Sequence, residues 1–68
     1  MANQEHVNIL KSGAAEWNKW RADNPGAKPD FSWANLAGVD MAGANLEGAN
    51  MKLAFCKGCR MDGAILKG

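Results

Sequence analysis

The stretch PDFSWANLAGVDMAGANLEGANMKLAFCKGCRMDGAILKG, residues 29–68, repeats one pattern every five residues. A Phe, Leu, Met or Cys stands at the centre of each unit, and a compact residue stands two positions before it. Six of the units close with Gly two positions after the centre. An α-helix has a period of about 3.6 residues and a strand a period of about two, so neither explains this spacing. A fixed short period is typical of a solenoid, whose coils bury their faces by stacking on one another.

The units predict a narrow core built from two sets of inward side chains. The central positions are Phe31, Leu36, Met41, Leu46, Met51, Cys56, Met61 and Leu66. The compact positions are Ala34, Val39, Ala44, Ala49, Ala54, Cys59 and Ala64. Glycine after each side is expected to form the corner turns, because it adopts positive φ without a Cβ clash.

Two of the units, ANLAG at 34–38 and ANLEG at 44–48, fit the loose motif A-(D/N)-L-x-G at every defined position. On these units the chain resembles the pentapeptide-repeat family, with eight repeats over residues 29–68. The resemblance implies a right-handed quadrilateral β-helix with four repeats in each square coil. The fold class expected is therefore an all-β solenoid of about two coils, preceded by one N-terminal α-helix, with neighbouring coils about 4.8 Å apart.

Four repeats in each coil would stack residues that are twenty apart in the sequence. This register places Asp40 over Arg60, Glu47 over Lys67 and Met41 over Met61. Opposite charges and apolar side chains thus fall on each other, as pairing between neighbouring strands favours. The pairs support the register.

Residues 3–23 are predicted to form one amphipathic helix that covers the first coil. Val7, Leu10 and Trp17 follow a helical spacing and are the candidate cap residues. Asn3 is the expected N-cap, and Gly13 is expected inside the helix, where it would permit close approach to the coil. An alternative is that the Trp-bearing face meets a partner groove or a membrane surface. Residues 1–28 then form the capping helix and linker, and residues 29–68 form the repeat domain.

Three apolar residues depart from the repeat on its outer side. Trp33 and Leu53 replace the corner glycine and are twenty residues apart, so they are expected to stack in one column. Phe55 stands where the motif has Asp or Asn and should also face outward. These side chains predict an exterior apolar patch, which either contacts a partner or lies under the helix or linker.

Cys56-Lys57-Gly58-Cys59 is a C-x-x-C motif, for which two interpretations stand. In the repeat register both thiols are inward, compact core residues that stay reduced. The alternative is a metal or redox site. A structural zinc needs four ligands, and the only further candidate is His6, which is expected to be solvated. The sequence therefore predicts no metal site and no cofactor.

Charge and composition exclude several classes of function. Eight Lys and Arg against seven Asp and Glu leave a net charge of +1, so no basic stripe favours nucleic acid. No apolar run approaches the roughly 20 residues of a membrane span, and the first residues do not resemble a signal peptide, so a cytoplasmic location is expected. No set of residues suggests catalysis or a small-molecule substrate, which predicts a protein that is not an enzyme.

The favoured hypothesis is a non-catalytic structural or protein-interaction module. The far end of the second coil, with Met61 and Leu66, is expected to be open and apolar, which invites association. It would meet a second copy in a homodimer or end-to-end oligomer, or continue into further coils of a longer parent chain. The resemblance supplies an alternative, because some pentapeptide-repeat proteins mimic DNA and inhibit DNA gyrase. The charge and length of this chain disfavour that role.

Overall fold

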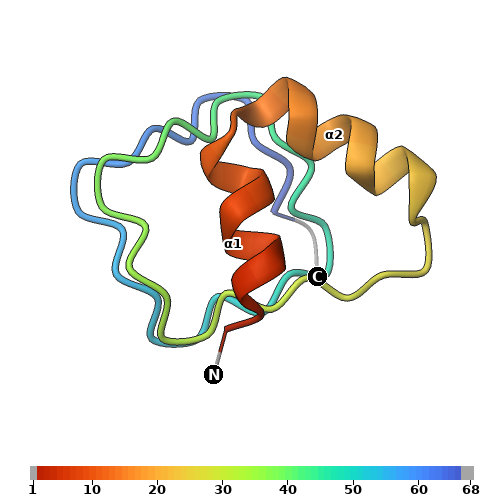
Figure 1. The fold of residues 1–68 in the computed structure, drawn as a ribbon. Coiled ribbons are helices and arrows are strands. Elements are labelled where there is room, and N and C mark those ends of the chain that lie inside the picture. Colours follow the sequence, from red (N-terminus) through yellow and green to blue (C-terminus); the bar gives the residue numbers. More distant parts are fainter. Residues whose placement is uncertain (1, 67–68) are drawn as a thin grey trace.

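The structure, a computed structural model, describes residues 2–66. Two helices, α1 (Gln4–Lys11) and α2 (Ala14–Asp23), precede a segment that winds through two stacked coils. Figure 1 shows the second coil following the path of the first, with α1 lying across the face of the coils. The helices therefore cover one end of the coil stack.

The prediction of a single helix over residues 3–23 was wrong, because the chain turns at Gly13. This residue has φ 124° and ψ 158°, a conformation that is open almost only to glycine. A Cβ built at Gly13 would meet no atom within 4 Å, so close approach to the coil is not the reason for glycine here. The turn lets both helices pack on the same coil. Asn3 caps α1 as predicted, with its side chain accepting hydrogen bonds from the Glu5 and His6 amides.

Four isolated parallel bridges join the coils, and each joins residues that are twenty apart. They pair Asp30 with Asn50, Asn35 with Phe55, Asp40 with Arg60, and Asn45 with Ile65. The backbone bonds run both ways: the Leu36 amide donates to the Phe55 carbonyl, and the Phe55 amide donates to the Ala34 carbonyl, at 2.6 and 2.8 Å. Within residues 2–66 no strand extends beyond these bridges, so the coils form a solenoid without the long strands implied by an all-β class.

The Asp or Asn that stands before the centre of a repeat has a structural role. Its side-chain oxygen accepts a hydrogen bond from the amide two residues later, as in Asn35 to Ala37 at 3.1 Å and Asp40 to Ala42 at 3.0 Å. This local bond stabilises the turn that follows. Phe55, Arg60 and Ile65 stand at the same position in the second coil and have no side-chain oxygen to accept this bond.

The helices and the first coil share one hydrophobic core. Trp17 and Leu10 from the helices are fully buried against Phe31, Leu36 and Met41 from the first coil. The central residues of the second coil only pack against this cluster and remain partly exposed. Burial therefore decreases along the stack from the helical end to the opposite end.

Candidate functional site

The helical end of the stack is closed by polar contacts as well as apolar ones. The Trp17 indole N–H donates to the Asn45 carbonyl at 2.7 Å, and the Asn45 amide donates to the Asn18 side chain at 2.7 Å. Arg21 reaches the Glu47 carbonyl at 2.8 Å. These side chains provide the partners that a neighbouring coil would otherwise provide. The predicted cap residues Val7, Leu10 and Trp17 are all buried. The roles of Asn18 and Arg21 were not predicted.

His6 belongs to the same cap, so the expectation that it is solvated was wrong. It is only 9% exposed, and its Nδ1 accepts a hydrogen bond from the Asp30 amide at 3.1 Å. Its ring lies 5.0 Å from the Trp20 ring, between centroids, and edge-on to Trp17 and Phe31. This contact joins α1 to the start of the first coil, and within residues 2–66 His6 belongs to no group of three His, Cys, Asp or Glu side chains that could hold a metal ion.

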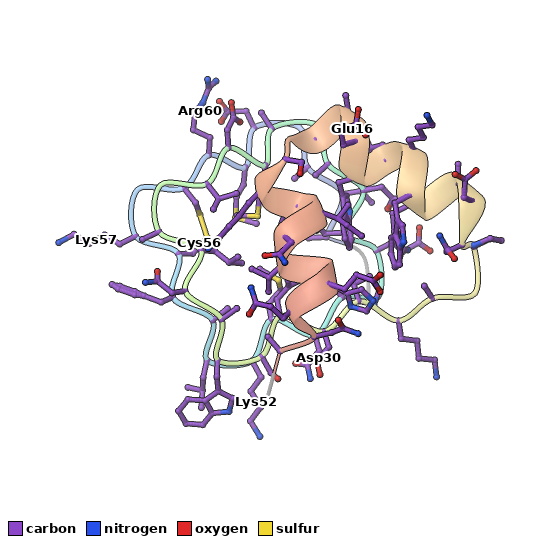
Figure 2. The ribbon with its side chains drawn as sticks, in the orientation of Figure 1. Glu16, Asp30, Lys52, Cys56, Lys57 and Arg60 are labelled. Atoms are coloured by element: carbon purple, nitrogen blue, oxygen red, sulfur yellow. A yellow bond between two sulfur atoms is a disulfide. The ribbon has the colours of Figure 1, made fainter. Side chains whose placement is uncertain are left out.

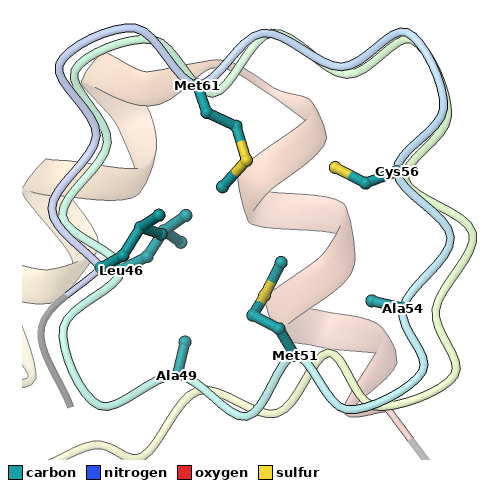
Figure 3. Close-up of a pocket in the computed structure, with 7 residues that line it drawn as sticks. Leu46, Ala49, Met51, Ala54, Cys56 and Met61 are labelled. Carbon is teal, nitrogen blue, oxygen red and sulfur yellow. The ribbon is translucent and has the colours of Figure 1, made fainter.

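The opposite end of the stack holds an apolar pocket of about 400 Å³. Its walls are the inward side chains Leu46, Ala49, Met51, Ala54, Cys56, Met61 and Leu66. Figure 3 looks into it and shows the Met and Cys side chains turned toward its centre. Leu66 is 55% exposed although the repeat pattern makes it a core position. The inward surface of the second coil thus has no cover within the part of the chain that the structure describes.

The backbone at this end is also unpaired. The Phe31, Leu36 and Met41 amides of the first coil donate to second-coil carbonyls at 2.6–2.8 Å. The corresponding amides of Met51, Cys56 and Met61 make no backbone hydrogen bond with any described residue. The carbonyls follow the same pattern. Those of Ala34 and Val39 accept hydrogen bonds from second-coil amides, while those of Ala54 and Cys59 accept none from a backbone amide of residues 2–66. The open end therefore presents both donors and acceptors at a solenoid edge.

Cys56 and Cys59 form a disulfide beside this pocket, so the expectation of reduced core thiols was wrong. The two residues are inward positions three apart in the sequence, and their Cα atoms are 5.4 Å apart. That separation lies within the usual range of about 4.4–6.8 Å for a disulfide. Neither residue is fully buried. The C-x-x-C pair therefore lies in the open face and not in a closed core.

The outer apolar edge, which we define as Trp33, Leu53 and Phe55, is exposed. Their exposed fractions are 64%, 60% and 47%, so the interpretation that the helix or linker folds over them was wrong. Trp33 and Leu53 have φ 65° and 57°, close to the values of the glycine corners. A side chain in this left-handed region costs roughly 1–2 kcal/mol. Trp33 also lines a shallow cavity of about 260 Å³ beside α1.

The charged side chains lie outside the coils, where Figure 2 shows Lys52, Lys57 and Arg60 pointing away from the stack. Arg60 approaches Asp40 of the first coil at 4.0 Å and Asp62 at 3.0 Å. The hydrogen bond that Arg60 donates to the Asp62 carboxylate, and then the charge of Asp40, raise the pKa of Arg60. These pairs are exposed, so solvent screens them and they contribute little to stability. The predicted pairing of Glu47 with Lys67 lies outside the described residues.

Within residues 2–66, no three side chains of the His, Cys, Asp and Glu types converge on a common point. Neither helix in that range has the length and apolar character needed to cross a membrane.

The comparison with known families agrees with the coil geometry. A family model of pentapeptide repeats matches residues 30–68 in eight copies. The chain belongs to the pentapeptide-repeat family. No curated protein and no solved structure matches it significantly. Membership of the pentapeptide-repeat family explains the five-residue period and the corners, but it does not specify what the open end binds.

Proposed function

We propose that this pentapeptide-repeat chain is a non-catalytic protein-interaction module that self-associates through its open end. The contrast between the two ends of the stack carries the proposal. At one end, Phe31 and Leu36 are fully buried under the helices. At the other end, Met51 and Met61 line an apolar pocket, and Leu66 is exposed. Large side chains such as these gain roughly 1.5–3 kcal/mol each when they are fully buried, which favours association.

The backbone favours a second copy as the occupant. A partner must offer acceptors to the Met51, Cys56 and Met61 amides and donors to the Ala54 and Cys59 carbonyls. The open end of another copy carries both kinds of group, so two such ends related by a twofold axis are self-complementary. Pairing through a coil edge is strand addition, which provides main-chain bonds without requiring a particular side-chain sequence.

The charges around the rim predict how this association depends on salt. The described part of the second coil carries Lys52, Lys57 and Arg60 against one acid, Asp62. Two such rims repel each other, and salt screens exposed charges over about 8–10 Å. Self-association should therefore strengthen as salt is added. An acidic protein partner on the same face would show the opposite dependence.

The detailed shape of the coils is also part of this proposal. The family suggests a right-handed quadrilateral β-helix, and the twenty-residue offset of the bridges supports four pentapeptides in each coil. A role as a DNA mimic that inhibits gyrase has no support from the charges, because the Asp40 column ends in the base Arg60 and is not acidic. A cytoplasmic location remains a prediction, and the redox state of Cys56 and Cys59 in cells would test it, since cytosolic disulfides are rare and usually transient.

The proposal is tested by light scattering after size exclusion, over a dilution series at low and high salt. The wild-type chain is expected to show twice the monomer mass at high concentration and to dissociate on dilution. Leu66→Lys places a charge in the open face and should give a folded monomer. Ile65→Lys is the matched control, because Ile65 is a neighbouring exposed residue that does not line the pocket, and it should remain dimeric.

Either of two results would contradict self-association. One is a wild-type monomer at every concentration and salt level, which would direct attention to a different protein partner. The other is a dimer that Ile65→Lys disrupts and Leu66→Lys does not. Circular dichroism of each variant verifies that a monomer is a folded monomer.

A further inference from the structure

Four sulfur atoms gather at the open end of the stack. Met51, Cys56 and Met61 line the apolar pocket, and Cys59 is bonded to Cys56. Figure 3 shows the Met51 and Met61 thioethers entering the pocket from opposite sides, with the Cys56 sulfur projecting from the wall beside them. Core packing alone would be served by any apolar side chain. The chain instead places two flexible thioethers around a dithiol pair, in a hollow that no described residue fills.

The disulfide must open before these sulfurs can act together. A dithiol reductant supplies two electrons, the bond between Cys56 and Cys59 breaks, and each sulfur takes up one proton. The two Cα atoms are 5.4 Å apart on a backbone that is bonded to the first coil, for example between Arg60 and Val39. The two thiols therefore remain neighbours after reduction. The reduced pocket then offers two thiols and two thioethers.

We propose that the reduced chain binds one Cu(I) ion in this pocket. The Cys56 and Cys59 thiolates would be the main ligands, with Met51 and Met61 completing the site, and two protons leave when the thiols bind the ion. Thiolate and thioether are soft ligands that select Cu(I) over harder ions. The other described residues that line the pocket are Leu and Ala, so the sulfurs are the only side-chain donors that these residues offer to the ion.

The absence of other donors identifies the ion class. Among the side chains of residues 2–66, no carboxylate or imidazole lines the pocket. Structural zinc sites use Cys and His, with four strong ligands, and here only the two cysteines are of that kind. Methionine thioethers make up the other half of the donor set, and this half distinguishes Cu(I) from Zn(II).

The site does not depend on self-association. Leu66→Lys retains all four sulfurs, so it should bind Cu(I) as the wild type does even if it is monomeric. Failure of the dimer and failure of the metal site are therefore separate results.

The test uses the reduced full chain under anaerobic conditions, with Cu(I) supplied as its acetonitrile complex and competed against bicinchoninate. Native mass spectrometry should show one copper per chain. Met51→Leu combined with Met61→Leu removes both thioethers and keeps an apolar wall. Since losing even an indirect partner of a metal ligand costs about 10–100-fold in affinity, this variant should bind at least about tenfold more weakly. Met41→Leu is the matched control, because Met41 is buried in the first coil, and its affinity should not change.

Three results would overturn the proposal. The first is no copper uptake by the reduced wild type beyond that of the Cys56→Ala, Cys59→Ala variant. The second is unchanged affinity in the Met51→Leu, Met61→Leu variant, which would leave an ordinary dithiol without thioether ligands. The third is tighter binding of Zn(II) than of Cu(I). Near-ultraviolet circular dichroism of the tryptophans verifies that each variant keeps the folded cap, and the methionine variant remains informative if the cysteine variant unfolds.

Discussion

Replacing Gly13 by Ala distinguishes the two-helix structure from a single continuous helix, because the two arrangements predict changes in stability of opposite sign. In a continuous helix, Ala at position 13 would stabilise the protein by about 1 kcal/mol, the usual difference between Ala and Gly in a helix. In the structure, Gly13 has φ 124° and ψ 158°. A residue with a Cβ in such a region costs about 1–3 kcal/mol. No atom lies within 4 Å of the new methyl group, so no clash adds to this backbone cost.

Gly26 provides a matched control for this substitution. A Cβ at Gly26 also meets nothing within 4 Å, but its φ lies outside the left-handed region. Gly26→Ala should therefore stabilise the chain by about 0.4–1 kcal/mol, through reduced freedom of the unfolded state. Urea unfolding followed by tryptophan fluorescence should give a lower midpoint for Gly13→Ala and an equal or higher midpoint for Gly26→Ala. A rise in stability for Gly13→Ala would refute the turn between α1 and α2.

Three further predictions test the cap, the acid response and the disulfide. Trp17→Phe leaves the Asn45 carbonyl without its indole donor and should lower the free energy of unfolding by about 1–3 kcal/mol, measured by urea unfolding followed by circular dichroism. The amide and then the hydroxyl of Ser32 lower the pKa of Asp30 below its ordinary value, so stability should fall as the pH drops below about 4, and Asp30→Asn should flatten that part of the pH profile. Reduction of the disulfide opens only a short loop and should cost about 2 kcal/mol while leaving a cooperative thermal transition, observed by calorimetry with and without a dithiol.

The coil register could be predicted from sequence because the information is local and repeated. Each unit carries its own centre, compact residue and turn, and eight copies leave little freedom in how the coils align. The predicted pair of Asp40 and Arg60 is present as both a backbone bridge and an ion pair. The exposed corners at Trp33 and Leu53 follow from the same register, since the pattern requires a left-handed residue there whatever its side chain.

The features that sequence reasoning missed depend on distant contacts or on redox state. The apolar spacing of the helical region continues through Gly13, so nothing in that pattern marks the turn. His6 is buried because it meets Asp30, twenty-four residues later, and Asn18 acts on a backbone amide twenty-seven residues later. One signal was available: Asn18 and Arg21 lie within one helical turn of the cap residue Trp17, where a purely apolar cap would not need them. The disulfide depends on redox conditions as well as on geometry.

The two ends of the stack both expose groups that need partners, and the difference in how they are covered supports a binding role for the open end. Any solenoid end exposes inward side chains and unpaired backbone groups. At the helical end the chain provides Trp17 for the apolar face, and Asn18 and Arg21 for the backbone. At the opposite end, residues 2–66 provide neither, and the exposed groups include a hydrogen-bonding edge and a cluster of sulfurs. Unpaired edges and exposed apolar faces are unfavourable in isolation, and this supports the proposal that another coil, or a ligand in the pocket, supplies the missing contacts.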